Sequence, residues 1–276
     1  MAAYDPSCAM PVARFRFYEE LNDFLAPDRH KREFAAPFAR AATVKNAIEA
    51  FGVPHTEVEL ILVNGCSVDF AYRLREGDRI SVYPRFETFD IEPLLRVRPK
   101  LLRTSRFIAD AHLGGLARLL RMAGFDTLYE NRWTDDEIRS RAGEEGRIIL
   151  TRDRALLMHR TVTHGCYVHA LEPRAQLREI LERLQLASSV RPFSLCLDCN
   201  VSLEPIGAAE VRDRIPQAVA AAYGRFSLCP GCRKVYWEGS HWRRMRALLG
   251  DILGADAPAE GQGCAASPAS QAAPRA

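Results

Sequence analysis

Residues 106–129 read RFIADAHLGGLARLLRMAGFDTLY. The segment begins with an apolar run, places Asp110 at the end of that run, continues into a helical pattern and starts a second apolar run. This alternation persists to residue 185, and strands that alternate with helices predict a parallel sheet with helices on both faces. We therefore predict an α/β domain over residues 101–190. The expected strands are 106–109, 126–130, 147–151 and 166–170, and the expected helices are 113–123, 134–143, 153–159 and 173–185.

The composition is that of an ordinary water-soluble protein. Hydrophobic residues make up 47% of the 276 residues and charged residues 26%. No run of about 18 apolar residues could span a bilayer, and the start of the chain lacks the basic and apolar regions of a secretory signal. We predict a cytoplasmic protein with no membrane contact and more than one domain.

The formal net charge of +3 is unevenly distributed. Residues 1–95 have 11 Lys+Arg and 15 Asp+Glu, residues 96–190 have 17 and 12, and residues 191–276 have 10 and 8. The centre is therefore basic and the first third acidic. A basic centre fits a polyanionic partner, and it fits an arginine-rich solvated surface equally well.

The first module, residues 1–95, has the pattern of a small α+β domain. VARFRF predicts a strand, and Thr43 is placed to cap a short helix that Gly52 ends. VELILVNGCSV places Asn64-Gly65 between two strands, which is a strong hairpin signal. LREGDRISVYP predicts a further turn and strand.

These motifs, above all ILVNG followed by LREGDRISVYP, resemble the ubiquitin-like β-grasp of small sulfur-carrier proteins. Sulfur carriers act through a free Gly-Gly end, whereas here the chain continues into RFETFDIEPLLRVRPK. We therefore interpret the module as an interaction or positioning domain with an unknown protein partner. The prolines and basic residues of 93–100 predict a linker.

Acidic residues follow two strands of the predicted parallel sheet. Asp110 comes after RFIA and Asp153 after RIILTR, while Asp135 and Asp136 open the helix that follows LYENRWT. Ligands of open α/β sheets bind beyond the carboxyl ends of the strands, and clustered carboxylates there favour Mg²⁺ or Mn²⁺. The alternative for each residue is a turn or helix N-cap, and Asp135 is well placed to be one. Asp126 begins a strand and so belongs to the opposite edge unless the turn folds back.

The segments FIADAHLGGLARLLRMAGFDTLY and TDDEIRSRAGEEGRIILTRDRALL resemble the PIN-like RNase domain of the Mut-seven C-terminal family. The resemblance implies a PIN-like fold, a metal-dependent ribonuclease activity on RNA, and homodimers, which PIN-type domains often form. It implies metal ligands at Asp110, at Asp135 or Asp136, and at Asp153. The family often has a basic residue where this chain has Gly115, which weakens the case for a phosphate contact from that turn.

Four arginines near these carboxylates are candidate phosphate contacts. Arg118 and Arg121 lie one turn apart on the first predicted helix, and Arg152 and Arg154 flank Asp153. Guanidinium groups bind phosphates through paired hydrogen bonds, and exposed surface charge is an equal alternative. The Thr151 hydroxyl is a further candidate ligand or water contact.

The cysteines of the last module predict a zinc site. CLDC contains Cys196 and Cys199, CPGC contains Cys229 and Cys232, and 29 residues separate the two motifs. Paired Cys-x-x-Cys motifs in a chain without a secretory signal favour a four-thiolate structural Zn²⁺ over disulfides. We predict a zinc ribbon with a basic helix over residues 191–250 and a disordered tail over 251–276.

Aromatic residues of this module alternate with basic ones. Tyr236, Trp237 and Trp242 stand among arginines and a lysine, an arrangement that can stack unpaired bases. Packing of the ribbon against the nuclease domain is the equal alternative.

The combined pattern predicts a metal-dependent ribonuclease: a PIN-like domain, preceded by a β-grasp domain and followed by a zinc ribbon. The alternative is a non-catalytic RNA-binding or adaptor protein on the same scaffold. Sulfur relay through the first module is a third and weaker reading. The RNA substrate, the mode of cleavage, the number of catalytic metal ions, the oligomeric state and the role of Asp126 in the metal site are open at this point.

Overall fold

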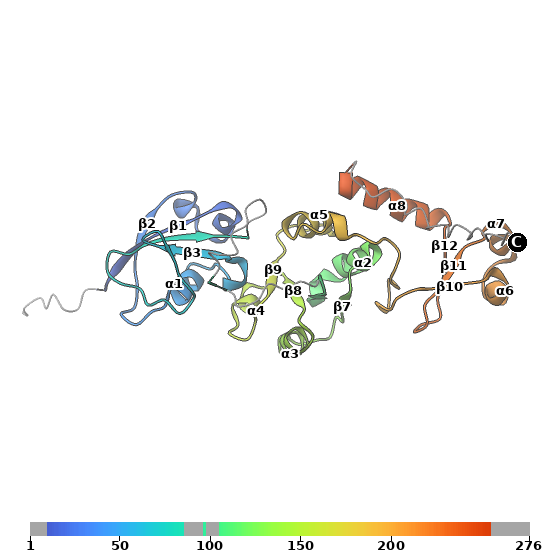
Figure 1. The fold of residues 1–276 in the computed structure, drawn as a ribbon, viewed down its shortest axis with the longest axis horizontal. Coiled ribbons are helices and arrows are strands. Elements are labelled where there is room, and N and C mark those ends of the chain that lie inside the picture. Colours follow the sequence, from blue (N-terminus) through green and yellow to red (C-terminus); the bar gives the residue numbers. More distant parts are fainter. Residues whose placement is uncertain (1–9, 86–95, 98–104, 255–276) are drawn as a thin grey trace, which may run out of the picture.

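The computed structural model describes residues 10–85, 96–97 and 105–254, which form three parts in a row (Figure 1). Each part has its own sheet, of five, four and three strands in chain order. We call these parts the head, the nuclease domain (after the family that its sequence resembles) and the ribbon. The predicted linker lies largely outside the described residues, and so does the predicted tail beyond residue 254.

The head is a β-grasp-like sheet with one helix. The first strand, Val12–Phe17, forms where it was predicted and alternates between the two faces of the sheet, because Phe15 and Phe17 are buried while Arg14 and Arg16 are exposed. Thr43 caps the helix in a capping box, and Asn64 and Gly65 both have positive φ, as the hairpin turn requires. The strands are β1 (Val12–Phe17), β2 (Phe34–Pro37), β3 (Leu60–Val63), β4 (Cys66–Ser67) and β5 (Arg79–Tyr83), in the order β2-β1-β5-β3-β4 with only β1 and β5 parallel. The helices are α1 (Val44–Ala50) and the 3-10 turns η2 (Glu19–Phe24), η3 (Pro27–Arg29) and η4 (His55–Glu57).

The nuclease domain has the predicted parallel sheet with helices on both faces. Phe107 and Ala109 pack into a core under α2 and α5, while Ile108, one residue out of phase, packs under α3 and α4. Its strands are β6 (Phe107–Ala109), β7 (Thr127–Tyr129), β8 (Ile148–Thr151) and β9 (Gly165–Tyr167), all parallel, in the order β7-β6-β8-β9. Its helices are α2 (Gly114–Ala123), α3 (Asp135–Glu145), α4 (Arg154–Met158) and α5 (Pro173–Arg183), with the turns η6 (Ala111–Leu113) and η7 (Ala187–Ser189).

The strand order identifies the ligand-binding edge of this sheet. The chain passes from β6 to β7 on one side and then crosses to β8 on the other side of β6. The connection that leaves β6 turns to β7 on one side, whereas the connection that leaves β8 turns to β9 on the other, so the two diverge above the carboxyl ends of β6 and β8. In open α/β sheets the ligand crevice opens at such a switch point.

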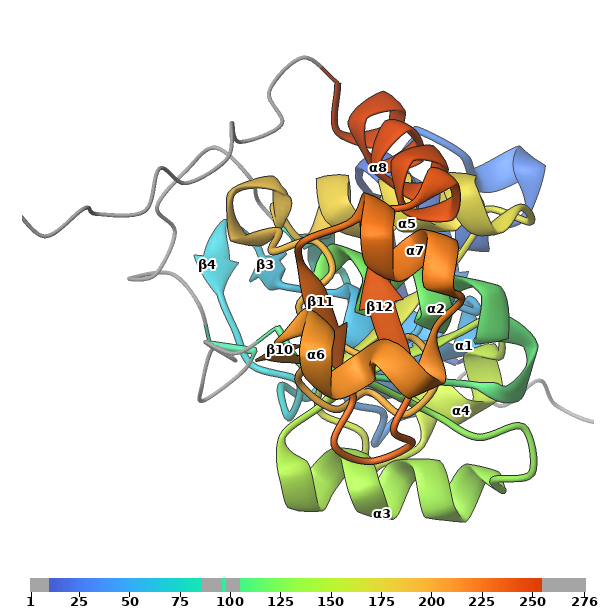
Figure 2. The same ribbon diagram turned by 90° about the vertical axis from the view of Figure 1, so that its right-hand side faces the viewer.

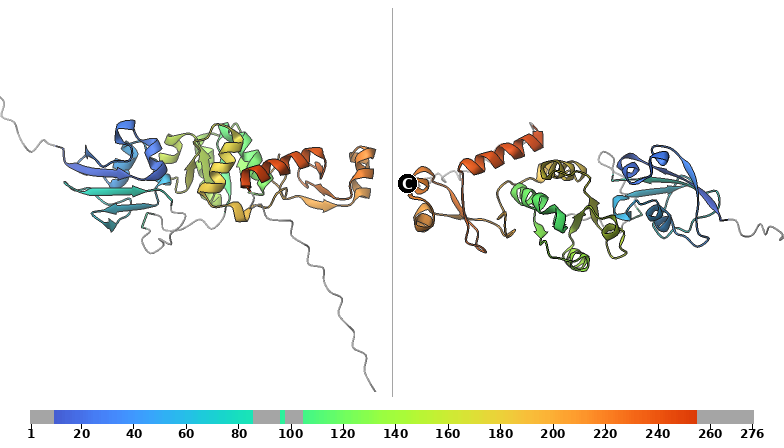
Figure 3. Two further views of the ribbon diagram at one scale, coloured as in Figure 1. Left: turned by 90° about the horizontal axis from the view of Figure 1, so that it is seen from above. Right: turned by 180° about the vertical axis from the view of Figure 1, so that it is seen from behind.

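The ribbon is a small antiparallel sheet followed by a long helix that returns to the nuclease domain. Leu249 and Ile252 of this helix join the core formed by α2 and α5 (Figure 3). Residues 251–253, which we predicted to be part of the tail, form the end of this helix. The elements are β10 (Glu204–Ile206), β11 (Phe226–Leu228), β12 (Val235–Trp237), α6 (Ala208–Val211), η8 (Arg212–Arg214), α7 (Gln217–Ala222) and α8 (Ser240–Leu253).

The head packs along the outer edge of β9. Nε2 of His55 lies 2.8 Å from the Val162 carbonyl oxygen, and the Glu57 carboxylate accepts a hydrogen bond from the Tyr167 amide. The same carboxylate forms an ion pair with Arg183, and its side chain is only 2% exposed. These contacts give hydrogen-bond partners to backbone groups at the otherwise open edge of the sheet, and they hold the head on the nuclease domain.

The ribbon packs against the other end of the nuclease domain (Figures 1 and 2). The Arg191 amide donates to the Ala123 carbonyl oxygen at 2.8 Å, and Asn200 Oδ1 accepts from the Thr127 amide at 2.9 Å. Gly124, with φ of 95°, ends α2, and a Cβ there would lie 2.2 Å from the Arg191 carbonyl oxygen. Glycine is therefore required both for the turn and for the close approach of the ribbon.

Within the described residues, no helix is both long and apolar enough to cross a membrane.

We expect Glu57→Ala to weaken the attachment of the head. The substitution leaves the Tyr167 amide without its acceptor and removes the buried partner of Arg183, although Glu179 and Glu20 stay within ion-pair distance. Breaking a buried pair typically costs about 3–5 kcal/mol, and the remaining partners reduce this to about 2–3 kcal/mol. Urea unfolding of the full chain measures the loss.

Glu33→Ala is the matched control, because Glu33 pairs with Arg14 and Arg79, whose side chains are 61% and 71% exposed. Exposed pairs contribute little to stability. Equal losses in the two variants would contradict the interpretation of the head interface.

Candidate active site and metal centre

Two acidic residues follow neighbouring strands at the switch point of the parallel sheet. Asp110 follows β6 and Asp153 follows β8 by two residues, and Ala109 pairs with Leu150 in the register of these strands. The Thr151 hydroxyl donates to Asp110 Oδ2 at 2.7 Å and accepts from the Asp153 amide at 2.9 Å. One threonine hydroxyl therefore joins the two acidic positions.

Each aspartate also caps the element that follows it. Asp110 Oδ1 accepts from the Ala111 amide at 2.6 Å, and Asp153 Oδ1 accepts from the Ala155 amide at 2.7 Å. An ionised carboxylate has about four acceptor positions, so these hydrogen bonds orient the side chains and leave capacity for a ligand. Asp110 is half-buried and Asp153 is exposed. Capping and ligand binding are thus compatible at both positions.

Asp135 and Asp136 open α3, the helix that follows β7. The N-cap of α3 is Thr134, which forms a capping box with Glu137, so Asp135 is not the cap. Asp136 forms an ion pair with Arg139, and its side chain is 86% exposed. Across residues 10–85, 96–97 and 105–254, only the four cysteines 196, 199, 229 and 232 bring three or more candidate metal-binding side chains within 4.8 Å of one another. Thr151 therefore links Asp110 to the Asp153 backbone, whereas the contacts of Asp136 and the cap of α3 are local to that helix.

Asp126 lies at the opposite edge of the sheet and has structural partners. Its carboxylate accepts from Arg147 and Arg106, and Asn200 of the ribbon donates to it at 2.5 Å. Burial raises the pKa of Asp126, but the hydrogen bonds from Arg147, Asn200 and Arg106 outweigh it, so that its pKa lies below the usual value. Asp126 thus fastens the start of β7 to the ribbon and lies away from the site at Asp110.

The predicted phosphate contact from Arg121 is wrong. Its side chain is buried, with 6% of the residue exposed, and donates to the carbonyl oxygens of Thr127, Leu197 and Asp198. Each of these acceptors is backbone, and two belong to the first cysteine knuckle. Arg121 therefore ties that knuckle to the nuclease domain. Arg118, one turn earlier, is exposed and pairs with Asp198 at 3.5 Å.

The arginines that flank Asp153 differ in their contacts. Arg152 donates to the Ala170 carbonyl oxygen at 3.0 Å and stays at the carboxyl edge of the sheet. Arg154 turns toward the head, where it donates to the Phe24 carbonyl oxygen and lies 4.9 Å from the centre of the Phe24 ring. Arg154 is thus a contact between head and nuclease domain, which corrects its predicted role.

The sequence analysis overlooked Tyr129 at this edge. Its hydroxyl donates to the Ala111 carbonyl oxygen at 3.0 Å, and a Cβ on Gly114 would lie 2.6 Å from that hydroxyl. Tyr129 therefore supports the turn that carries Asp110. Because Tyr129 is the last residue of a strand, the sequence could have placed it at the carboxyl edge of the sheet.

The four cysteines form a compact cluster as predicted. Cys196 Sγ lies 3.4 Å from Cys199 Sγ and 3.6 Å from Cys232 Sγ, and Cys199 Sγ lies 3.5 Å from Cys229 Sγ. Sulfur atoms around a tetrahedral Zn²⁺ with bonds of about 2.3 Å lie about 3.8 Å apart. The cluster therefore fits a single zinc ion with a filled coordination shell.

Tyr236 supports this cluster from β12. Its hydroxyl lies 3.2 Å from Cys196 Sγ and accepts from the Leu197 amide at 3.3 Å. Burial raises the pKa of Cys196, but hydrogen bonds from Tyr236 and from the amides of Cys199 and Asp198 lower it to about 6. Cys196 is thus prepared to bind a metal ion as a thiolate.

Two families match the chain along its length. Residues 105–249 match the Mut7-C RNAse domain, and residues 10–90 match the Mut7-C ubiquitin domain. The first match spans more than half of the chain. The chain belongs to the Mut7-C RNase family. Both the nuclease domain and the ribbon lie in the matched range, so a nuclease-type function belongs to the two together.

The solved structures that match include the crystal structure of the H. volcanii small archaeal modifier protein 1 and that of SAMP1 from Haloferax volcanii. They are 13% and 14% identical to this chain, cover 28% of it and 99% of their own chains, and each has a TM-score of 0.23. A comparison with curated proteins finds no match.

We expect the purified Mut7-C chain to bind one zinc ion through these thiolates. The double variant Cys196→Ser and Cys229→Ser removes one thiolate from each knuckle, and zinc should be lost together with the near-ultraviolet circular dichroism of the ribbon. Metal analysis measures the stoichiometry. Cys66→Ser is the control, since Cys66 is an exposed free thiol of the head. A double variant that keeps its full zinc content would contradict the assignment.

We expect Asp126→Asn to destabilise the protein at neutral pH. Because the folded state lowers the pKa of Asp126, its stabilising contribution is present above the unfolded value of about 3.9 and disappears as the pH falls through the folded value. The difference in unfolding midpoint between wild type and variant should therefore begin to shrink below about pH 4 and narrow further as the pH falls through the lower folded value. Thermal unfolding followed from pH 7 to pH 3 tests this, and a constant difference would contradict it.

Proposed function

We propose that this protein is a metal-dependent ribonuclease that hydrolyses RNA phosphodiester bonds at the carboxyl ends of β6 and β8. Membership of the Mut7-C RNase family supports a nuclease in general. The observation that carries the location is the Thr151 hydroxyl, which joins Asp110 to the backbone of Asp153 at the switch point of the sheet.

The two aspartates suit Mg²⁺ or Mn²⁺ by their chemistry. Carboxylate oxygens are the ligands these ions prefer, and Mg²⁺ in phosphate chemistry is commonly held by one or two carboxylates together with substrate oxygens and waters. When bound, such an ion lowers the pKa of a coordinated water and stabilises negative charge on the phosphoryl group. Two carboxylates are therefore a sufficient protein contribution.

The residues of the chain have distinct roles in this proposal. Thr151 and the Ala111 amide fix the orientation of Asp110, and the Ala155 amide fixes that of Asp153. Fixed ligands avoid reorganisation during the reaction. Tyr129 holds the turn between β6 and α2.

Arg121 and Arg154 have other contacts, so we assign the binding of substrate phosphates to the two remaining candidate arginines. Arg152 lies next to Asp153, and Arg118 lies on the exposed side of α2, the helix that follows Asp110. Asp135 and Asp136 follow the carboxyl end of β7 and belong to the same edge of the sheet, where their contribution to catalysis stays a prediction.

The zinc ribbon and the head serve as supporting modules. Four thiolates fill the zinc shell, so we assign the zinc a structural role. The head is fastened to β9 and Arg154, which favours positioning over free movement, while its far side is available to a protein partner. The predicted cytoplasmic location and homodimer stay predictions.

A non-catalytic RNA-binding protein is the second candidate. It is favoured by one observation: a third carboxylate does not join Asp110 and Asp153 within the described part of the chain. This candidate predicts RNA binding without divalent-dependent cleavage.

We expect the purified protein to cleave single-stranded RNA with Mg²⁺ or Mn²⁺. Asp110→Asn and Asp153→Asn should each reduce the rate by at least about 100-fold, the usual effect of removing one preorganised electrostatic contact from a transition state. Cleavage of a labelled oligonucleotide under single-turnover conditions measures the rate, and circular dichroism verifies the fold. Thr151→Val should give a smaller loss, because it removes only the support of Asp110.

Asp251→Asn, an exposed aspartate of α8, is the control and should keep full activity. Undiminished cleavage by the Asp110 and Asp153 variants would overturn the proposed site. Absence of any divalent-dependent cleavage in wild type would favour the non-catalytic alternative.

A further inference from the structure

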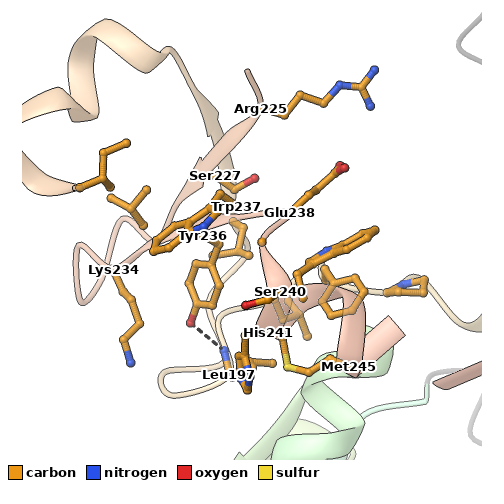
Figure 4. Close-up of a pocket in the computed structure, with 18 of the residues that line it drawn as sticks. Leu197, Arg225, Ser227, Lys234, Tyr236, Trp237, Glu238, Ser240, His241 and Met245 are labelled. Atoms are coloured by element: carbon orange, nitrogen blue, oxygen red, sulfur yellow. Dashed lines mark hydrogen bonds between the residues drawn. The ribbon is translucent and has the colours of Figure 1, made fainter. Parts of the chain in front are cut away.

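A pocket of about 760 Å³ opens between the ribbon, the start of α8 and α2 (Figure 4). Pockets of about 300–1,000 Å³ hold ligands of drug-like size, and a nucleotide belongs to that class. Aromatic and basic side chains line it together, whereas Glu238 is its single acidic lining residue. The residues on which the argument depends are Arg118, Arg225, Arg233, Trp237, Gly239 and Trp242.

Trp237 is the aromatic side chain best placed to contact a ligand. Tyr236 is already engaged with Cys196 and Leu197, and the Trp242 ring lies 5.1 Å from that of Phe193 and 5.3 Å from the Arg246 guanidinium. Trp237 is half-buried, packs against the small core of the ribbon on one side, and lines the pocket. Gly239 makes room for it, since a Cβ there would lie 2.7 Å from Trp237 Nε1.

Three guanidinium groups of the pocket have no ion-pair partner in the part of the chain that the structure describes, and one of them, Arg214, donates to the Arg233 carbonyl oxygen. Arg225 and Arg233 are both exposed. In contrast, Arg118 and Lys234 share the Asp198 carboxylate. Figure 4 shows Arg225 and Lys234 extending at opposite sides of the pocket. Cations beside an aromatic platform are complementary to a nucleic acid strand, whose phosphates bind the cations while its bases stack.

We propose that this pocket binds an unpaired stretch of RNA, with one base stacked on Trp237 and the neighbouring phosphates at Arg225 and Arg233. The proposal rests on the proposed function only in taking RNA as the ligand, and it deepens that function by assigning a substrate-binding site outside the catalytic edge. A base can enter the pocket only when it is unpaired, so the site selects single strands over duplexes.

Most of the pocket belongs to the ribbon, which contacts the end of α2 far from the carboxylates, and Arg118 is the residue of α2 that lines it. Asp110 precedes the first residue of α2, while the ribbon contacts its last residue, and ten residues of helix rise about 15 Å. A stacked strand advances about 3.4 Å per nucleotide, so about four nucleotides bridge that length. Arg118 lies on α2 between the two sites and lines the pocket. An RNA held in the pocket therefore reaches Asp110 only if it is several nucleotides long.

Binding is measured by fluorescence anisotropy with the full chain carrying Asp110→Asn, so that RNA is not cleaved. We expect Trp237→Ala to weaken binding of a single-stranded 12-mer by at least about fivefold, as loss of one stacked base does. Gly239→Ala should weaken it in the same direction by pushing the indole from its place. Unchanged zinc content establishes that the ribbon is folded in each variant.

The cationic contacts are tested by the salt dependence of binding. The double variant Arg225→Ala and Arg233→Ala should lower the slope of log K against log salt by about 1.4, or about 0.7 per lost phosphate contact on a single strand. The matched control is Arg212→Ala with Arg244→Ala, two exposed arginines of the same module outside this pocket. The control should keep nearly the wild-type slope.

Length and strandedness complete the test. Trp237→Ala in the otherwise wild-type chain should lower the single-turnover rate of cleavage of a 12-mer. It should leave the rate with a trimer unchanged, because a trimer cannot span both sites. An equal binding defect for duplex RNA, an unchanged affinity in Trp237→Ala, or an equal loss of slope in the arginine control would overturn the proposal. Because binding is scored in a cleavage-deficient chain, absence of nuclease activity in wild type defeats the proposed function and leaves this site standing.

Discussion

The parallel pairing of β6 with β8 is the constraint on which the site depends. Register places Ala109 beside Leu150, so the residues that leave these strands emerge together at the same edge. The Thr151 hydroxyl then spans the remaining gap by donating to Asp110 and accepting from the Asp153 amide. Without this pairing, two carboxylates 43 positions apart in the chain would have no reason to share a crevice.

The nuclease domain has a different supporting module at each end. The head covers the outer edge of β9 near the carboxyl ends of the strands, through Glu57 and Arg154. The ribbon covers the start of β7 and the end of α2, through Arg121, Asp126 and Asn200. The zinc ribbon is therefore not a lid on the carboxylates. Its aromatic and basic pocket reaches α2 at Arg118, beyond the turn that carries Asp110, which suits a strand-binding role better than a catalytic one.

Three largely buried arginines form hydrogen bonds or ion pairs between different elements of this molecule. Arg121, Arg147 and Arg183 are each largely removed from solvent, and each has carbonyl or carboxylate acceptors supplied by other elements. A planar guanidinium with five donors can satisfy several such acceptors at once. This is why the basic centre of the chain does not translate directly into a nucleic-acid-binding surface.

Local patterns in the sequence determined the strands, helices, hairpin turn and cysteine knuckles, because each depends on residues within a few positions of one another. Alternation at Phe15 and Phe17, the Thr43 cap, Asn64-Gly65 and the paired cysteines are of this kind. The sequence also placed Asp110 and Asp153 after neighbouring parallel strands, since parallel strands have their carboxyl ends at the same edge. Tertiary structure alone decided which arginines face solvent and that Asp126 fastens the ribbon. These outcomes depend on acceptors supplied by distant segments, and no short-range pattern of the chain encodes where those segments will lie.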